Sequence, residues 1–182
     1  MADTFTLKVI ARIKSDFTQK FGIPRQSSRG GGQLSTVVFE PEYRDANALR
    51  GIEGYSHLWL IWGFSMVERQ GWRPTVKPPR LGGNTRMGVF ATRSPYRPNP
   101  IGLSSVKLVS MENRPGLGHV LTVEGADLMD GTPIYDIKPY LSFTDSHPEA
   151  KDGFAGEKLE KNLHVVFPEE LLIALPADKR EA

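Results

Sequence analysis

The apolar residues of this chain are divided among many short segments, and this division restricts the fold more than any other feature of the sequence. From Leu7 to Ile13 every second residue is apolar, which is the period of a strand with one buried face. Glycine and proline separate the segments and act as turn signals. Many short strands with few helices predict an all-β fold, mostly an antiparallel β-barrel. Strands are expected at residues 7–13, 33–40, 56–65, 87–92, 103–112, 119–127, 132–141 and 164–167.

Helical patterns are few and short. Residues 44–51 predict a short helix that Gly51 closes, and residues 168–175 predict a second helix that begins with a proline. A long basic loop, rich in proline and glycine, is expected over residues 67–86.

A chain of 182 residues is long enough for one domain with its own core. We expect a barrel domain over residues 1–145. Over residues 146–182 we expect a loose polar segment, a short strand and the start of a C-terminal helix, as in a shortened appendage. No apolar run approaches the ~20 residues of a membrane helix, and the N-terminus lacks a signal-peptide pattern. The absence of cysteine excludes disulfides and thiolate zinc sites, and a cytoplasmic location is expected.

The net charge of +2 conceals an uneven distribution. Residues 1–110 carry 16 basic and 7 acidic side chains, whereas residues 111–182 carry 7 basic and 14 acidic ones. No acidic residue lies between Glu68 and Glu112. A region of one sign attracts polyanions, and nucleic acid is the polyanion that lysine and arginine most commonly bind. The alternative is a solvated loop face that the acidic part of the chain neutralises.

Several common site motifs are absent from the sequence. No glycine-rich motif joins a strand to a helix, so a Rossmann nucleotide site is not expected. The four histidines, His57, His119, His147 and His164, lack the spacing of metal ligands, so no metal site is expected.

Three polar clusters remain as candidate functional sites. The first, FGIPRQ at residues 21–26, places Arg25 and Gln26 on a stiff loop and alone is typical of a surface turn. The second, TRSPYRPNPIGLS at residues 92–104, contains three prolines, which disfavour a helix interior or a central strand. It predicts a rigid loop that presents Arg93, Arg97 and Asn99, a set better suited to recognition than to packing.

The third cluster, GADLMDGTPIYDIKPY at residues 125–140, contains three carboxylates in an otherwise apolar region. Asp130 followed by glycine is also a turn signal. The density of Asp127, Asp130 and Asp136 nevertheless indicates a site for a cation or for hydrogen-bond donors.

Together with HLWLIW at residues 57–62, these clusters resemble the TrmO/TsaA-like family of β-barrel, S-adenosylmethionine-dependent tRNA methyltransferases. Members of that family methylate N6 of threonylcarbamoyladenosine at position 37, beside the anticodon. The resemblance extends from residue 5 to about residue 145. It implies a homodimer with the methyl donor near the subunit contact. Family members commonly carry a longer C-terminal segment.

The resemblance also implies which residues bind S-adenosylmethionine. Four separate segments supply them: Pro24, Arg25, Gln26, His57, Leu58, Arg93, Leu103, Asp127, Leu128, Met129 and Asp130. Asp127 or Asp130 can offset the sulfonium and ammonium cations of the donor. Arg25 or Arg93 can hold its carboxylate. Backbone groups of Leu103 and Leu128 are expected at the adenine.

Methyl transfer to nitrogen requires alignment of the reactants and removal of a proton. Asp136, Tyr140 and His57 are the candidate proton acceptors, and the sequence does not distinguish among them. Arg97 or Lys138 is expected to pair with the threonyl carboxylate of the substrate. Arg73, Lys77 and Asn99 complete the expected RNA-binding set.

Two other functions fit the same residues. The chain can be a non-catalytic RNA-binding barrel, in which tryptophans stack on bases. Trp59 and Trp62 lie in an apolar strand and are expected in the core, whereas Trp72 is the better candidate for exposure. Alternatively, the chain can be a methyltransferase for a small molecule, with the basic region incidental.

Overall fold

The structure is a computed structural model that describes residues 4–19, 21–24, 27, 32–66, 71–156, 166 and 168–174. It contains two compact units, Met1–Ser146 and His147–Ala182.

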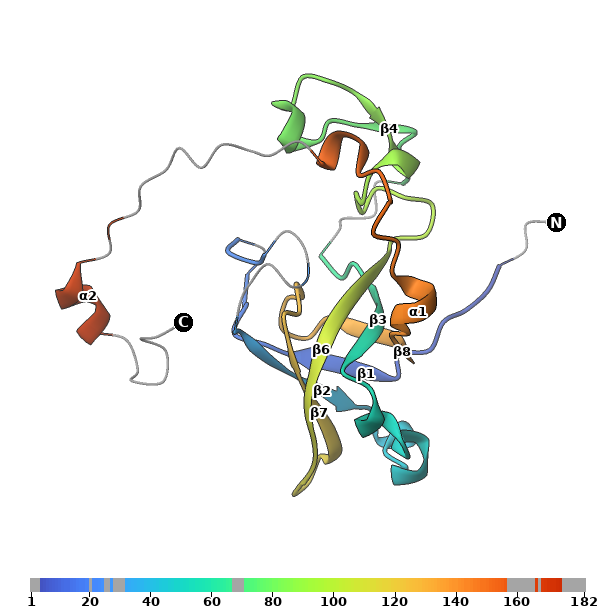
Figure 1. The fold of residues 1–182 in the computed structure, drawn as a ribbon, viewed down its shortest axis with the longest axis vertical. Coiled ribbons are helices and arrows are strands. Elements are labelled where there is room, and N and C mark those ends of the chain that lie inside the picture. The colour runs from blue at the N-terminus through green and yellow to red at the C-terminus, as the bar shows by residue number, and fades with distance from the viewer. Residues whose placement is uncertain are drawn as a thin grey trace. The chain divides into compact units, whose positions relative to one another are not determined.

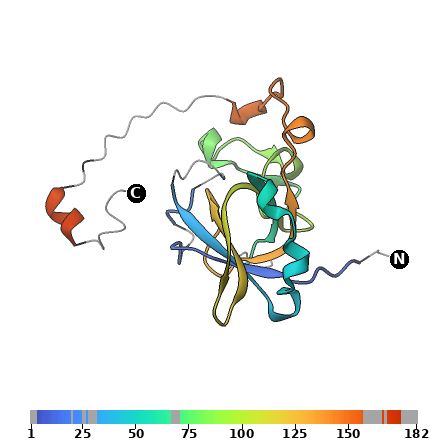
Figure 2. The ribbon, with the colours of Figure 1, turned by 60° about the horizontal axis from the view of Figure 1, so that its bottom comes forward.

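Six strands of the first unit close into a barrel in the order β1-β2-β7-β6-β3-β8 (Figures 1 and 2). Every neighbouring pair is antiparallel. The all-β, antiparallel barrel expected from the sequence is therefore confirmed. The barrel strands are β1 (Ala11–Lys14), β2 (Leu34–Phe39), β3 (His57–Gly63), β6 (Ile101–Arg114), β7 (Gly118–Glu124) and β8 (Pro133–Pro139).

Alternation along the strands separates the core from the outer face. In β3 the side chains of Leu58, Leu60 and Trp62 are buried in the barrel, and Trp59 and Ile61 point outward. Side chains from all six strands form the core. Since each fully buried leucine or valine contributes about 1.5–3 kcal/mol, this inner layer is the main source of stability.

The predicted hairpin of residues 103–127 is present as β6 and β7. β6 is the longest strand, and the hairpin extends beyond the other strands (Figure 1). Its turn contains Gly116 and Gly118, both with positive φ. The side chain of Arg44 donates to the backbone oxygens of Phe39 and Gly116 and so ties the turn to β2.

Between β2 and β3 the chain forms three short 3-10 helices. They are η1 (Pro41–Tyr43), η2 (Ala46–Leu49) and η3 (Ile52–Gly54). The helix predicted over residues 44–51 is thus a single 3-10 turn, followed by Gly51 at φ 87°. The Asp45 carboxylate accepts from the Asn47 backbone N–H and caps the N-terminus of η2.

The region between β3 and β6 contains a small two-stranded sheet that is separate from the barrel. Its elements are β4 (Thr75–Val76), η4 (Pro79–Leu81), β5 (Met87–Gly88) and η5 (Val89–Ala91). The strand predicted over residues 87–92 was therefore too long. After Gly88 the chain turns so that Val89 is buried, and Arg97 donates to the Val89 and Thr92 carbonyls.

A short helix, α1 (Ser142–Asp145), follows β8 in the first unit. The second unit contains η6 (Gly153–Ala155) and α2 (Glu169–Ile173), which confirms the helix predicted near residue 168. The strand predicted at residues 164–167 lies outside the described residues except for Val166. Within the described ranges, no helix has the length and apolar character needed to cross a bilayer.

Candidate functional site

A cavity of about 630 Å³ lies where β3 ends and β6 begins. Its size falls within the usual range of about 300–1,000 Å³ for small-molecule sites. Residues from the three predicted clusters and from β3 surround it. The described lining residues are Ile23, Pro24, Ser27, Trp59, Trp62, Phe64, Thr92, Arg93, Arg97, Ile101, Gly102, Leu103, Ser105 and Asp127.

Asp127 enters this cavity from the segment that follows β7. The Ser104 hydroxyl donates to Asp127 Oδ1 at 2.5 Å, and the Trp62 indole N–H donates to Ser104 Oγ at 2.9 Å. Ser104 is 1% exposed and Trp62 is part of the core. The carboxylate is therefore held by a buried chain of two hydrogen bonds that begins inside the barrel.

Burial raises the pKa of Asp127 above its ordinary value. Hydrogen bonds from Ser104 and from the backbone of Asp127 and Ser27, together with the charge of Arg93, act in the opposite direction but are weaker. A raised carboxylate pKa in a cavity is a common property of functional sites.

The hydrogen bonds that link Trp62, Ser104 and Asp127 depend on the absence of a side chain at position 102. A Cβ on Gly102 would lie 2.3 Å from Trp62 Cε2 and Cζ2. Phe64 contacts the same indole in an edge-to-face arrangement with ring centroids 4.5 Å apart. The indole is thus fixed on both sides.

The two arginines of the proline-rich loop differ in their environments. Arg93 is exposed at the cavity, as the sequence predicted for a loop that presents it. Arg97 is half-buried, and one of its guanidinium nitrogens donates to the backbone oxygens of Thr92 and Val89. Arg97 therefore fixes the loop beside Arg93 while still lining the cavity.

Trp59 forms part of the cavity wall on the outer face of β3. Its indole N–H donates to Asp145 Oδ2 at 2.8 Å, and the Leu141 backbone N–H donates to the same oxygen. The Tyr140 ring packs against it at 5.4 Å. Trp59 is half-buried rather than part of the core, which corrects the expectation from the apolar strand, because β3 turns this side chain outward. Trp62 is in the core and Trp72 is exposed, as expected.

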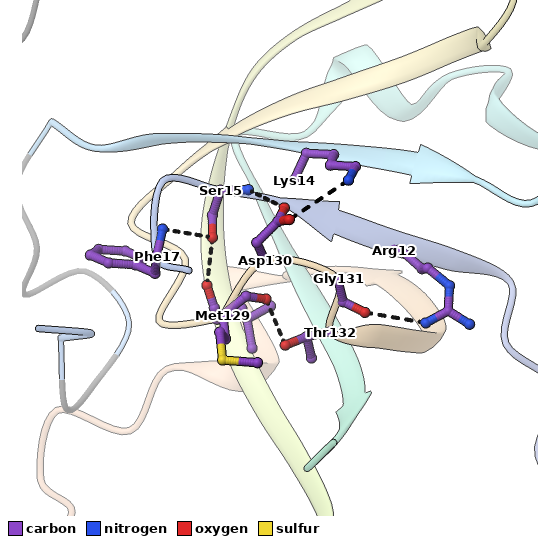
Figure 3. Close-up of polar contacts among 9 residues, drawn as sticks. Arg12, Lys14, Ser15, Phe17, Met129, Asp130, Gly131 and Thr132 are labelled. Atoms are coloured by element: carbon purple, nitrogen blue, oxygen red, sulfur yellow. Dashed lines mark hydrogen bonds and ion pairs between the residues drawn. The ribbon is translucent and has the colours of Figure 1, made fainter. Parts of the chain in front are cut away.

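Asp130, a predicted cofactor-binding residue, lies among polar contacts that join the end of β1 to the segment before β8 (Figure 3). Its Oδ1 accepts from the Ser15 backbone, and Lys14 Nζ lies 3.7 Å from Oδ2. The carbonyls of Leu128 and Met129 accept from Ser15 Oγ and Thr132 Oγ1. Of the predicted donor-binding segment at residues 127–130, only Asp127 is among the described residues that line the cavity.

The other predicted residues lie on β3, on β8 or directly after β8. The predicted proton acceptors His57, Tyr140 and Asp136 are not among the lining residues. Asp136 Oδ2 lies 3.0 Å from Lys138 Nζ, and the Tyr140 backbone N–H donates to His57 O. Leu58 is buried in the core, so its side chain does not face the cavity.

The predicted RNA-binding side chains outside the cavity are exposed. Arg73 lies over the Tyr96 ring at 5.2 Å, and Lys77 and Asn99 face solvent. Arg25 and Gln26, predicted cofactor-binding residues, lie outside the described residues. Pro24 and Leu103 line the cavity, and their predicted role in donor binding remains a prediction.

The chain matches the family model of the tRNA-methyltransferase O N-terminal domain over residues 12–146. The chain belongs to this family. A tRNA (adenine(37)-N6)-methyltransferase of Escherichia coli is 43% identical over 171 residues, which cover 92% of this chain and 71% of the relative. A protein of the same name from Eikenella corrodens is 56% identical over 56% of both chains.

The fold is similar to the crystal structure of TrmO from Pseudomonas aeruginosa, with a TM-score of 0.71 and 35% identity. The match covers 88% of this chain and 67% of that one. The chain therefore spans between about half and about two thirds of the length of most of these relatives.

Within this tRNA-methyltransferase O domain, two residues that hold Asp127 were not predicted as site residues from the sequence. Ser104, which lies behind the cavity wall, ends the quoted proline-rich motif, and Trp62, which lines the cavity, was assigned only to the core. Their hydrogen bond joins positions 42 residues apart, and the bond to Asp127 joins positions 23 apart. The pairing of β3 with β6 brings Trp62 and Ser104 together inside the barrel. The one signal that the sequence offered is Ser104 itself, a short polar residue at an inward position of a strand.

Proposed function

We propose that this protein is an S-adenosylmethionine-dependent tRNA methyltransferase that methylates N6 of threonylcarbamoyladenosine at position 37. The observation that carries this proposal is the cavity, in which one carboxylate and two guanidinium groups face a wall of aromatic and aliphatic side chains. Membership of the tRNA-methyltransferase O family supports the substrate class.

The lining residues fit the methyl donor chemically. The Asp127 carboxylate suits a cationic group, and Arg93 suits a carboxylate. Trp59, Phe64 and Leu103 offer apolar surface for an adenine ring. When bound, S-adenosylmethionine supplies a methyl group whose bond to sulfur breaks with its electron pair left on sulfur. The protein then has to exclude water, align the nitrogen and take up its proton.

The basic segment of residues 71–97 is the proposed tRNA-binding surface. It carries six arginine and lysine residues and no acidic residue. Arg73 and Lys77 are proposed to contact phosphates, and exposed Trp72 offers a ring for stacking on an unpaired base. Because the same segment supplies Arg93 and Arg97 to the cavity, RNA bound along it would lie next to the methyl donor. Arg97 and Lys138 remain the proposed partners of the threonyl carboxylate.

We also propose a cytoplasmic homodimer. Ile101, Leu103 and Val109 project from the outer face of β6 and are 38%, 55% and 46% exposed. Ile101 and Leu103 form a short row of exposed apolar side chains, which Ser105 and Lys107 separate from Val109, and such a row suits contact with a second copy of the chain. Leu103 belongs both to this row and to the cavity, in keeping with a methyl donor near the subunit contact.

Two measurements test the proposed activity. Calorimetry with S-adenosylmethionine is expected to give one site per chain, and absence of heat from a folded sample would leave only an RNA-binding role. Radioactive methyl incorporation is expected with tRNA that carries threonylcarbamoyladenosine and not with tRNA that lacks it. Donor binding without incorporation into either tRNA would favour a small-molecule substrate.

A further inference from the structure

Asp127 is the one side chain that can exchange a proton near neutral pH among the described residues that line the cavity. The charged groups that face it there are the guanidinium groups of Arg93 and Arg97. The remaining polar lining side chains are Ser27, Thr92, Ser105 and the indoles of Trp59 and Trp62. A proton released inside this cavity therefore has Asp127 as its nearest acceptor of suitable basicity.

The hydrogen bonds to Asp127 have a fixed direction. An indole N–H can only donate, so Ser104 Oγ must be the acceptor of the bond from Trp62. The single hydroxyl hydrogen of Ser104 is then available for Asp127 Oδ1. Ser104 is 1% exposed, so its hydroxyl has no water to donate to in place of Asp127 when the carboxylate is protonated. The chain thus favours ionised Asp127 and fixes the position of its carboxylate.

Two opposing influences act on Asp127. Burial raises its pKa, which makes the carboxylate a stronger base than an exposed one. The hydrogen bond from Ser104 acts in the opposite direction and favours the ionised form. A carboxylate that is more basic than an exposed one and is fixed in position is suited to general-base catalysis.

Building on the proposed methyltransferase function, we propose that Asp127 accepts the proton from the attacking nitrogen and that Ser104 and Trp62 position its carboxylate. The nitrogen–hydrogen bond breaks, and the proton binds a carboxylate oxygen of Asp127. The nitrogen keeps the electron pair and uses it to form the bond to the incoming methyl group. No further reactant is needed. Asp127 is then a catalytic residue, and Ser104 and Trp62 are positioning residues.

This assignment differs from the proton acceptors that the sequence suggested. Asp136 already has Lys138 at 3.0 Å and the Ile137 backbone N–H on its other oxygen. The His57 ring contacts Ser56 Oγ at 3.0 Å, and Tyr140 packs on Trp59. None of these three residues lines the described cavity.

The first test needs no ligand and uses the indole of Trp62 as the reporter. Proton–nitrogen correlation spectra are recorded from about pH 3.5 to about pH 8, and W59F and W72F identify the Trp62 signal by elimination. The Trp62 N–H shift is expected to titrate with a midpoint above the ordinary value of 3.8 for aspartate. The titration is expected to vanish in D127N. In S104A the midpoint of the Trp62 N–H titration is expected to rise, or the Trp62 signal is expected no longer to respond to Asp127. A Trp62 signal that titrates unchanged in D127N would overturn the hydrogen-bond chain.

The second test separates proton transfer from donor binding. Single-turnover methylation at saturating donor is expected to fall about 10²–10⁴-fold in D127N. In S104A the acid limb of the rate profile is expected to move upward by about one to two pH units, since a donor to the ionised form is lost. S35A removes another buried hydroxyl, on the inner face of β2, and is expected to keep the wild-type profile.

The outcomes distinguish this inference from the proposed function. A wild-type protein that binds no donor or methylates no tRNA rejects the proposed function, and the base role with it. An active wild type together with an equally active D127N rejects only the role of Asp127, and a loss of activity in H57A, D136N or Y140F would then return that role to one of those residues. An S104A profile that coincides with S35A rejects Ser104 as a positioning residue.

Discussion

Burial of a carboxylate lowers the stability of the fold that holds it, and Asp127 illustrates this effect. Its raised pKa means that the folded state binds its proton more tightly than the unfolded chain does. Below the ordinary value of 3.8 both states are protonated, so the residue costs nothing. As the pH rises through that value the unfolded state ionises first, and stability falls until the folded pKa is passed.

D127N should therefore gain stability relative to the wild type as the pH rises. The expected result is a thermal midpoint difference that is small near pH 4 and larger in favour of D127N near about pH 8. Differential scanning calorimetry across this range measures it. A difference that stays constant with pH would show that Asp127 is not destabilised by burial of its charge.

Arg93 provides a second prediction at the level of one side chain. R93A should weaken S-adenosylmethionine binding about 10- to 100-fold, because a hydrogen bond between charged groups contributes about 1.5–3 kcal/mol. Calorimetry measures the affinity, and circular dichroism should show an intact barrel. R86A removes the same charge from a side chain that donates to Thr75 Oγ1 outside the cavity, and it should bind the donor like the wild type. Equal affinities for the two variants would remove Arg93 from the site.

The pairing of β3 with β6 sets the geometry of the site at the level of elements. Gly102 stands opposite Trp62 in the register, and the indole occupies the space that a side chain at position 102 would need. The hydrogen bond from Trp62 to Ser104 and the packing of the indole thus depend on the same strand pair.

G102A is expected to lower stability by about 1–3 kcal/mol, the usual effect of overpacking a core, and to displace the Trp62 indole. Denaturant unfolding measures the first effect and the Trp62 N–H signal the second. G88A is the matched control, because a Cβ there has nothing within 4 Å and the backbone φ is −57°. Similar unfolding free energies for the two variants would mean that the indole moves aside without cost.

The elements were predictable to the extent that alternation determines them. β2, β3, β6, β7 and β8 lie where short apolar segments between turn signals predicted strands, because at least one face of each strand is in the core. The strand predicted at residues 87–92 was wrong beyond Gly88, since hydrogen bonds from the Arg97 side chain, which the apolar pattern does not show, stabilise a 3-10 turn there. The Trp62–Ser104–Asp127 chain could not be predicted for the same reason: its members meet only in the closed barrel.

The β4–β5 region is the element proposed to bind tRNA, and two of its cations allow a direct test. R73E combined with K77E should weaken tRNA binding at least about tenfold while leaving donor affinity unchanged, because phosphate contacts are replaced by repulsion. Filter binding measures the tRNA affinity. K8E combined with K151E changes the net charge equally through exposed lysines elsewhere, and it should have a much smaller effect.

At the scale of the whole molecule, the charge asymmetry makes the two ligands respond differently to salt. The first 110 residues are strongly basic and the rest are acidic, so tRNA binding should release counterions from the RNA. A methyl donor held in the cavity by single charge pairs releases few. The logarithm of tRNA affinity should therefore fall linearly with the logarithm of salt concentration, with a slope of about −0.7 to −0.9 for each phosphate contacted.

The slope also counts the contacts that one element supplies. If Arg73 and Lys77 each meet a phosphate, the slope for R73E combined with K77E should be shallower than that of the wild type by about 1.4–1.8. The slope for the K8E and K151E variant should match the wild type. Titrations at four or more salt concentrations measure all three lines, and calorimetry with S-adenosylmethionine in the same buffers should show little change. Three parallel lines would mean that tRNA is held by a surface other than residues 71–97.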